Sequence, residues 1–470
     1  MARSFLPYNL DQRLLLPPDM RDWLPEGHLA LFISDVVEEL DLSAIYATYQ
    51  RRDVRGRSAY HPGMMARLLI YGYCVGIPSS RRIEKATHED VAFRVLAGDQ
   101  HPDHDSIATF RKEHLSSLAG LFLQVLHLCQ KAGLVKLGHI AIDGTKMKAN
   151  ASKHKAMSYG RMSETEKKLE EEVRKLLEEA ERIDAEEDEK YGKGRRGDEL
   201  PAELARRESR LKKIREAKAE LEAEAKVAAE AKAQEVKERL AERARQEEET
   251  GKKVGGRPPE MPDPEKAKPE DKAQRNFTDP DSRIMPDGAN KGSFLQAYNA
   301  QIAVDAEAQI IVATAVVQAT NDKRELVPMA QKIVENVGRL ADVTSADAGY
   351  FSEQAVTDPL LAATELLVPP NRQKHGESPA EGKVAAQAGG ETPTAGMRAK
   401  LQSPTGKDLY RMRKAIVEPV FGQTKEARGF RQFLLRGLAQ VCAEFDIIAL
   451  THNLLKLYRR TWQATTVVPA

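Results

Sequence analysis

Apolar residues recur at helical spacing through much of residues 1–135. The clearest stretch runs from His61 to Gly98 and is broken at Gly76-Ile77-Pro78, where a tight turn is expected. Short helices separated by tight turns are typical of a helix-turn-helix arrangement that binds DNA. They are equally typical of an ordinary helical bundle with a basic, solvated face, and the pattern favours neither interpretation.

The pattern changes at residues 136–160. Ile140 and Ile142 alternate with small residues, which predicts a short strand that ends at Asp143 and is followed by a turn at Gly144. A charge-dense block then fills residues 161–250, in two helical runs around a glycine-rich break. In the second run a narrow apolar stripe predicts an antiparallel coiled-coil hairpin, formed by Leu211, Ile214, Ala217, Leu221 and Ala225.

Residues 251–275 are rich in proline and read as a linker. From residue 294 the pattern becomes α/β, and residues 371–396 are of low complexity and predict a loose loop. The expected elements are a strand hairpin at 294–305 and 308–319, a helix at 321–337, a strand ending at Asp347, a helix at 352–363, a strand at 365–370, and a helical tail that contains Glu418.

Length and composition add to this picture. The chain has 470 residues and 41% hydrophobic content, enough for two or three folded units. No stretch approaches 18 consecutive apolar residues and the first 20 residues lack a signal-peptide pattern, so we expect a cytoplasmic protein without a membrane span. The three cysteines lack any metal-binding spacing and are expected to be free thiols.

The net charge of +1 hides two populations. Residues 161–250 hold 23 basic and 28 acidic side chains, so the remainder has 49 basic against 43 acidic ones. Within that remainder, residues 398–460 have 13 basic and 5 acidic side chains. Local basic surface is what attracts phosphate, so the neutral total does not exclude a nucleic-acid partner.

Three acids fall where a fold could bring them together. Asp143 and Asp347 end predicted strands, and Glu418 lies in a helix that could pack beside them. Converging carboxylates repel one another unless cations lie between them, and Mg²⁺ takes oxygen ligands of this kind. Two such ions suit phosphodiester displacement. Singly, each acid has a simpler interpretation: a turn residue at 143, a helix cap at 347 and a first-turn helix acid at 418.

The chain resembles the bacterial insertion-sequence transposases of the DDE type. The segments "AIDGTKMKANAS" and "ADAGYFS" resemble the motifs of the first two acids in that family. The segment "YRMRKAIVEPVFGQTKEARGFRQFLLRG" resembles the third, with Glu418 and Lys425 at the family's Glu-x6-Lys spacing. The related pattern Tyr-x2-Arg-x3-Glu is not met, because Arg413 lies five residues before Glu418, and Lys414 has the arginine spacing instead.

The resemblance implies an RNase H-like catalytic domain, formed by residues 136–160 and 276–460, after an all-helical DNA-binding domain at 1–135. It implies Mg²⁺-dependent cleavage and strand transfer, with two ions held by Asp143, Asp347 and Glu418 and with Mn²⁺ as a substitute. The partners implied are double-stranded DNA, both terminal inverted repeats and target, and a second copy of the chain in a homodimer. The protein would lie on the bacterial nucleoid when bound to DNA. The DNA-contacting residues would be Arg413 or Lys414, Lys425, Arg81, Arg82, Arg111 and Lys112. A nuclease that cuts without joining and a DNA-binding scaffold remain the alternatives.

Overall fold

The computed structural model combines helices with one mixed sheet and begins with an all-helical region, as the sequence predicts. It separates into two compact units, residues 1–148 with 298–470, and residues 149–297. The residues it describes are 19–50, 59–191, 202–251, 259–288, 290, 292–371 and 392–462.

The described part of residues 1–135 contains helices and no strand. Proline begins α3 and Asp90 caps α5 through the N–H groups of Ala92 and Phe93, while Gly98 ends α5 in the left-handed conformation. These helices are η1 (Met20–Trp23), α1 (Leu29–Glu39), α2 (Ser43–Gln50), α3 (Pro62–Cys74), α4 (Ser80–Glu89), α5 (Val91–Ala97), α6 (His104–Glu113) and α7 (Leu115–Lys131).

A mixed sheet forms the centre of the first unit. Strand β1 lies between β5 and β7, β8 pairs with β7, and β6 pairs antiparallel with β5. Strands β1, β7 and β8 run parallel. The bounds are β1 (His139–Lys148), β5 (Phe294–Asp305), β6 (Ile311–Val317), β7 (Val343–Ala346) and β8 (Glu365–Leu367), with α10 (Leu326–Val337) after β6. The predicted hairpin of 294–305 and 308–319 is confirmed.

Two predictions about this sheet are wrong. Strand β1 does not end in a turn at Gly144 but continues to Lys148. The helix expected at 352–363 is only α11 (Glu353–Val356) and a 3-10 turn (Pro359–Ala363). Pro359 disfavours the helical conformation at the residue before it, which favours an end of the helix ahead of this position.

The C-terminal region is helical, as predicted, and begins earlier than expected. The loop predicted at 371–396 lies outside the described residues from 372 to 391, and its last residues belong to α12 (Pro393–Gln402), which Thr392 caps. Then follow α13 (Pro404–Gly422), a π-helical turn (Gln423–Ala427), α14 (Leu438–Leu457) and a second π-helical turn (Tyr458–Trp462).

Proline lies inside α13, at Pro419, and leaves one carbonyl without its usual partner. That carbonyl belongs to Ala415, four residues earlier, and accepts a hydrogen bond from the side chain of Gln309 at 2.9 Å. Gln309 lies in the turn between β5 and β6 with a φ of 57°. The sheet therefore supplies the bond that α13 lacks.

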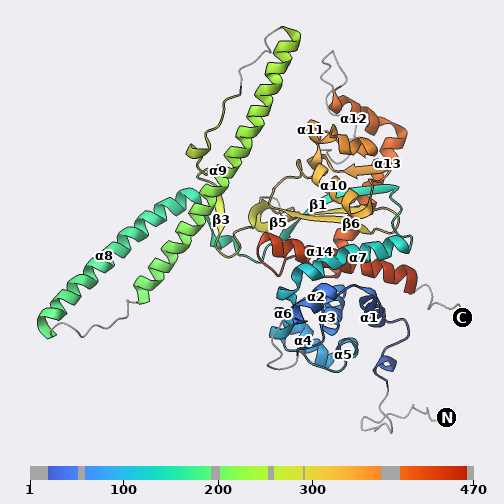
Figure 1. The fold of residues 1–470 in the computed structure, drawn as a ribbon, viewed down its shortest axis with the longest axis horizontal. Helices are drawn as coiled ribbons and strands as arrows, with labels where there is room; N and C mark the ends of the chain where they lie inside the picture. Colours follow the sequence, from blue (N-terminus) through green and yellow to red (C-terminus); the bar gives the residue numbers. More distant parts are fainter. Residues whose placement is uncertain are drawn as a thin grey trace, which may run out of the picture. The chain divides into compact units, whose positions relative to one another are not determined.

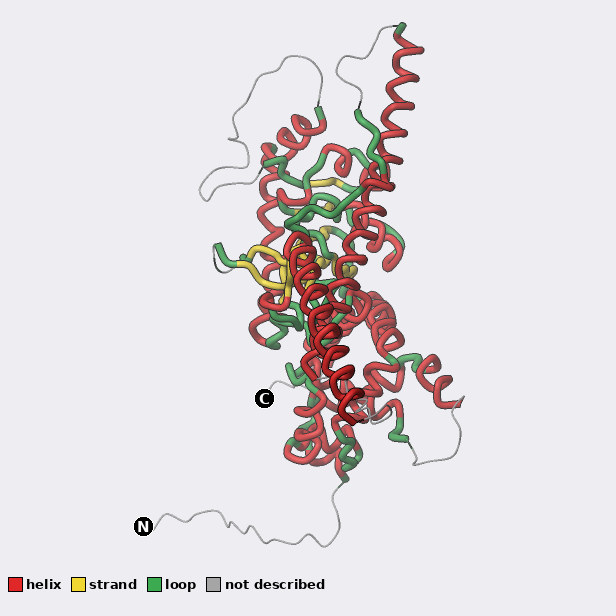
Figure 2. Tube along the Cα trace, turned by 90° about the vertical axis from the view of Figure 1, so that its left-hand side faces the viewer, coloured by secondary structure: helices red, strands yellow, loops and turns green. Residues whose placement is uncertain are grey.

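Helix α14 joins the sheet to the N-terminal helices. It packs against α7 and α3 on one side and β6 on the other, so the N-terminal helices and the sheet lie on opposite sides of it (Figure 1). In the side view of Figure 2 the strands again lie above a lower group of helices. Asn453 exchanges two hydrogen bonds with the backbone of Ile311, at 2.9 and 2.8 Å. His452 is fully buried between the carbonyl of Gln309, at 2.8 Å, and the side chain of Gln423.

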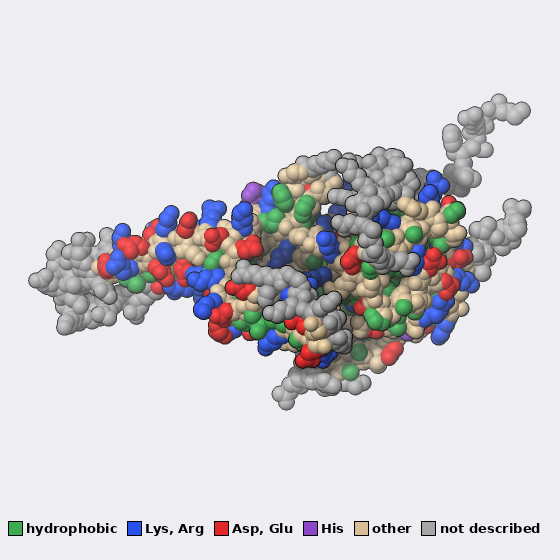
Figure 3. Space-filling model, turned by 90° about the horizontal axis from the view of Figure 1, so that it is seen from above, with side chains coloured by type: hydrophobic (Ala, Val, Ile, Leu, Met, Phe, Trp, Pro, Cys, Tyr) green, Lys and Arg blue, Asp and Glu red, His purple; other side chains and the backbone are tan. Residues whose placement is uncertain are grey.

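The second unit contains α8 (Tyr159–Tyr191) and α9 (Ala202–Thr250). The predicted stripe packs against α8, with Leu211, Ile214 and Leu221 buried beside Met162 and Leu169. Ion pairs join the two helices: Glu166 pairs with Lys218, and Glu172 pairs with Arg207. The residue numbers rise along α8 and fall along α9, so the helices are antiparallel. Side chains of both charges are interspersed along the hairpin (Figure 3).

The unit also holds β2 (Ala156–Ser158), η3 (Pro264–Lys266) and β3 (Gln274–Asn276), with β2 and β3 paired antiparallel, and β4 (Arg283–Pro286), which pairs with the first residues of β5. Among the described helices of the whole chain, none combines the length and apolar character needed to span a membrane.

Burial of His452 predicts a loss of stability in acid. Burial lowers the pKa of His452 from 6.5 to about 3, so the unfolded chain takes up a proton that the folded chain does not. This stability is present above pH 6.5 and is lost as the pH falls towards 3. His452→Gln should remove up to about 1.4 kcal/mol per pH unit from the slope of unfolding free energy between pH 6 and 4. Urea unfolding at several pH values measures that slope.

The matched control is His127→Gln, because His127 is exposed on α7. It should leave the slope as in the wild type. Equal slopes for the wild type and His452→Gln would show that His452 does not stay neutral in the folded protein.

Candidate active site

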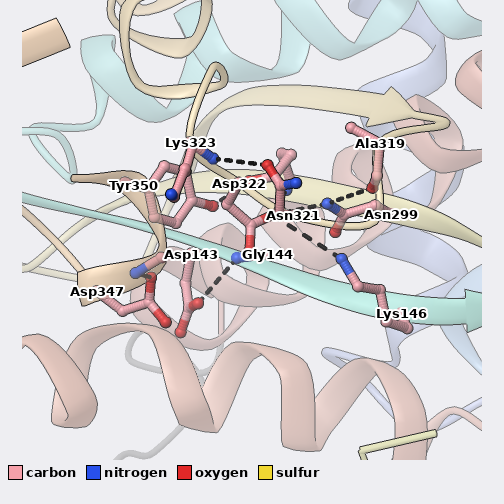
Figure 4. Close-up of polar contacts among 12 residues, drawn as sticks. Asp143, Gly144, Lys146, Asn299, Ala319, Asn321, Asp322, Lys323, Asp347 and Tyr350 are labelled. Carbon is pink, nitrogen blue, oxygen red and sulfur yellow. Dashed lines mark hydrogen bonds and ion pairs between the residues drawn. The ribbon is translucent and has the colours of Figure 1, made fainter. Parts of the chain in front are cut away.

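The register of two parallel strands places Asp143 beside Asp347. In the β1–β7 pair, His139 aligns with Val343 and Ile142 with Ala346, and the two acids are the next residues on each chain. Neighbouring strands lie about 4.8 Å apart, so the carboxylates are close neighbours. Figure 4 shows Asp143 and Asp347 side by side. The prediction that both acids come from the ends of neighbouring strands is confirmed for Asp347, whereas Asp143 lies within its strand.

Each carboxylate has one oxygen bonded to the backbone. Asp143 Oδ1 accepts from the N–H of Gly144 at 2.8 Å, and Asp347 Oδ1 accepts from the N–H of Gly349 at 2.8 Å. Asp347 thus caps the short 3-10 turn Ala348–Tyr350, while Ser352 caps α11. Among the described residues no donor bonds Asp347 Oδ2. Asp347 can therefore cap the turn with Oδ1 and still bind a ligand with Oδ2.

Arg413 of α13 compensates the charge of Asp143. Its Nη1 donates to Asp143 Oδ2 at 2.9 Å, and its side chain is only 9% exposed. Burial raises the pKa of Asp143 to about 6, Arg413 opposes that rise, and the neighbouring Asp347 adds to it. Burial alone would lower the pKa of Arg413, but Asp143 and Tyr410 raise it. The site favours positive charge.

Further charged side chains lie on the Gly144 side of the pair. Lys146 Nζ is 4.0 Å from Asp322 Oδ1. Burial lowers the pKa of Lys146, against the opposing effect of Asp322 and Asp347. Burial and Asp322 also raise the pKa of Glu325. With Asp143 and Asp347, this region holds four acids, and the bases Lys146, Arg413 and Lys425 lie beside them.

Sequence reasoning missed Asp322 and the buried polar residues around it. Asp322 Oδ1 accepts hydrogen bonds from Asn299 at 2.6 Å and Gln301 at 2.7 Å, and Gln301 Oε1 accepts one from the hydroxyl of Tyr350. Figure 4 shows Asp322 between Asn299 and Tyr350. Asn299 and Gln301 are fully buried in β5. The amides Gln296, Asn299 and Gln301 within a largely apolar strand were the available signal, since buried polar side chains need partners.

The third motif lies on α13, but Glu418 does not join the pair through any contact that the structure describes. Glu418 is exposed, and five residues after Arg413 it lies about 140° around the helix. It belongs to the end of α13, so its interpretation as a first-turn acid is wrong. Its assignment as the third acid stays a prediction.

The basic residues predicted to contact DNA lie in different environments. Arg413 is buried against Asp143 and Lys414 is exposed. Lys425, in the π-helical turn, bonds Thr145 Oγ1 and donates to the carbonyl of Lys146 at 3.1 Å, so it is held against β1. In the N-terminal helices, Arg81, Arg82 and Lys112 are exposed, and Arg111 donates to the carbonyl of Pro78 at 2.8 Å.

Asp143 and Asp347 fit a hard cation as a pair. They present adjacent carboxylates, one oxygen of Asp347 accepts no hydrogen bond from the part of the chain that the structure describes, and a guanidinium already neutralises Asp143. Within the described residues, however, no three His, Cys, Asp or Glu side chains are grouped so as to hold a metal ion. The described residues therefore provide two adjacent carboxylates and no third ligand.

Two family models match the chain. The one described as "Transposase domain (DUF772)" matches residues 18–113, and the one described as "Transposase DDE domain" matches residues 372–458. The first match spans η1 and α1 to α6, and the second includes Glu418 and Lys425. Comparisons with curated proteins and with solved structures give no match.

The Arg413–Asp143 pair predicts a large effect of one substitution. Arg413→Gln removes the guanidinium and leaves two adjacent carboxylates without it. It should lower the free energy of unfolding by about 2 kcal/mol, because a largely buried charge loses its partner. Chemical unfolding of the metal-free protein measures this loss.

Lys414→Gln is the control, since Lys414 carries the same charge in an exposed position next along α13. It should change stability by less than about 0.5 kcal/mol. Equal effects of the two substitutions would argue against a specific bond between Arg413 and Asp143.

Proposed function

Because the chain belongs to the insertion-sequence transposases of the DDE type, we propose that it cuts DNA at the ends of a mobile element and joins those ends to target DNA. The observation that supports the proposal most is the in-register pair of Asp143 and Asp347. Carboxylates from neighbouring strands can hold cations, and basic side chains nearby can hold phosphate, which suits a displacement at the phosphorus of a phosphodiester.

The proposed cofactor is Mg²⁺, as two ions held by Asp143 and Asp347 together with Glu418, with Mn²⁺ as a substitute. When bound, such ions supply positive charge to the attacking and leaving oxygens of the displacement. The adjacent carboxylates of Asp143 and Asp347 support a divalent cation. The role of Glu418 rests on its motif and on the match of the DDE domain to its segment.

The proposed role of the neighbouring basic residues is to hold DNA phosphates. Lys425 bonds Thr145 of β1, which lies two residues after Asp143. This position supports a role close to the scissile bond. Of the two candidates on α13, the exposed Lys414 suits the DNA backbone, and Arg413 suits a phosphate bound against the acid pair. Such contacts do not depend on the DNA sequence, because every nucleotide carries a phosphate.

The proposed organisation follows the same reasoning. The order of strands around β1 supports an RNase H-like catalytic domain formed by residues 136–160 and 276–460. The N-terminal helices, residues 1–135, would recognise the element's terminal repeats. The hairpin of 161–250 would support assembly as a coiled coil, with 251–275 as its linker. Two DNA ends must be cut together, so we propose a homodimer that acts on the nucleoid.

Substitution of the three acids tests this function. Asp143→Asn, Asp347→Asn and Glu418→Gln should each reduce Mg²⁺-dependent cleavage of a labelled, end-bearing duplex by on the order of 10³-fold or more, because residues that act as one unit fail together. Binding of the same duplex should persist. A second, unlabelled target duplex in the reaction reports joining.

Asp342→Asn and Glu426→Gln are the matched controls, as both acids are exposed and lie near the same elements. They should cleave at the wild-type rate. Cleavage without joined product would indicate a nuclease, and binding without any cleavage would indicate a scaffold. Full activity of Asp347→Asn would reduce Asp347 to a cap.

The exposed bases of the N-terminal helices predict a change in salt dependence. Replacing Arg81, Arg82 and Lys112 together with Gln should weaken binding of terminal DNA and flatten the log–log salt slope by about 0.9 for each phosphate that these side chains neutralise in the wild type. Fluorescence anisotropy at several salt concentrations measures both. Lys131→Gln, an exposed base at the end of α7, is the control, and an unchanged slope in the triple variant would exclude these residues from the DNA interface.

A further inference from the structure

A side chain from β5 extends across β1 at Gly144. Strand β1 lies between β5 and β7, yet Gln301 of β5 accepts a hydrogen bond from Tyr350, which follows β7. A Cβ atom at residue 144 would lie 2.4 Å from Gln301 Nε2 and 3.0 Å from its Cδ. Such distances leave no room for a side chain. Glycine follows Asp143 because Gln301 passes over that position.

The direction of the Gln301 amide is fixed by Asp322. Gln301 Nε2 donates to Asp322 Oδ1 at 2.7 Å, and Asn299 donates to the same oxygen at 2.6 Å. With its nitrogen directed at a carboxylate, the amide presents its oxygen to Tyr350. Burial raises the pKa of Tyr350 well above its usual value, so the hydroxyl keeps its proton and donates.

Tyr350 ends the 3-10 turn that Asp347 caps. Asp347 Oδ1 bonds the N–H of Gly349, inside that turn. A Cβ atom at Gly349 would lie 2.9 Å from Asp347 Oδ1 and 3.5 Å from Asp322 Oδ2, so the two carboxylates approach the same point. The turn is therefore held at both ends, by Asp347 at its start and by Gln301 at its end.

We propose that Gln301 and Tyr350 are positioning residues that set the placement of Asp347 relative to Asp143. Their hydrogen bond connects the turn after β7 to β5, which lies on the other side of β1. The Gln301 side chain that makes this bond packs against Gly144, the residue after Asp143. Asp322 orients the bond and does not need to touch DNA or a cation. This inference rests on the proposed function in one respect, namely that the acid pair is where the cation and the phosphate bind.

Hydrogen exchange measured by mass spectrometry on the full chain tests the connection itself. Tyr350→Phe removes only the hydroxyl, and Gly144→Ala displaces Gln301 by its Cβ. Each should speed exchange in the segments 139–148 and 343–353 by about fivefold, the ratio that corresponds to one hydrogen bond of ordinary strength. Because both changes break the same hydrogen bond, the double variant should exchange no faster than the single ones.

Tyr73→Phe is the matched control, since Tyr73 is equally buried but lies in α3. It should leave both segments unchanged. Unchanged exchange in Tyr350→Phe, a substitution that keeps the ring and its packing, would overturn the proposal even if Gly144→Ala failed to fold.

Binding of Mn²⁺ alone, followed by electron paramagnetic resonance, tests the consequence for the pair. Loss of residues that orient ligands typically costs tenfold or more in metal affinity, so Tyr350→Phe should raise the Kd for Mn²⁺ by about tenfold. The concentration of ion needed for half-maximal cleavage should rise equally, with activity recovered at saturating ion. An effect on melting temperature without any change in Kd would mean a merely structural role and would contradict the proposal.

The outcomes separate the two proposals. A wild type that binds Mn²⁺ but cuts no DNA removes the proposed function and leaves the positioning roles to be decided by the change in Kd. A wild type that binds no Mn²⁺ removes the proposed cation site, and the exchange rates then decide whether the Gln301–Tyr350 bond fixes the turn. A wild type that binds and cuts, with Tyr350→Phe unchanged in both, removes the positioning roles alone.

Discussion

The structure depends on one constraint: two carboxylates are held side by side because they follow aligned residues of parallel strands. Like charges at this distance repel, and burial raises the pKa of Asp143 further, so each acid must be compensated. Arg413 provides one opposing charge and backbone N–H groups occupy one oxygen of each acid. Among the described residues the second oxygen of Asp347 accepts no hydrogen bond, which suits the proposed binding of a cation there.

The helix that provides Arg413 is itself held by the sheet. Pro419 leaves the carbonyl of Ala415 unbonded within α13, and Gln309 satisfies it from the β5–β6 turn. His452 of α14 contacts the same turn and Gln423 beyond α13. The motif that includes Glu418 and Lys425 is thus anchored to the strands on one side and to α14 on the other. Because α14 also packs against α7 and α3, the N-terminal helices and the acid pair share one folded unit.

The sequence predicts the elements with strong periodicity and the two acids that their pairing brings together. Strand β5 begins and ends at the predicted residues, and Asp143 and Asp347 lie together as expected. The turn at Gly144 was wrong because glycine there serves a close approach from another strand, which local sequence does not reveal. Gln301 and Tyr350 were missed for the same reason, since their importance arises only from the order of strands. The placement of Glu418 depends on the rotation of α13, which spacing alone does not determine.

The most direct test of a cation site at this pair is to map where a divalent ion binds. Fe²⁺ bound in place of Mg²⁺, with ascorbate and peroxide, cleaves the polypeptide backbone close to the ion. Mass spectrometry of the fragments then identifies the cleaved positions. The structure predicts cuts next to Asp143 and next to Asp347, both suppressed by excess Mg²⁺ and lost in Asp143→Asn. Cuts confined to other segments, such as the acidic hairpin of α8 and α9, would contradict a cation site at the paired strands.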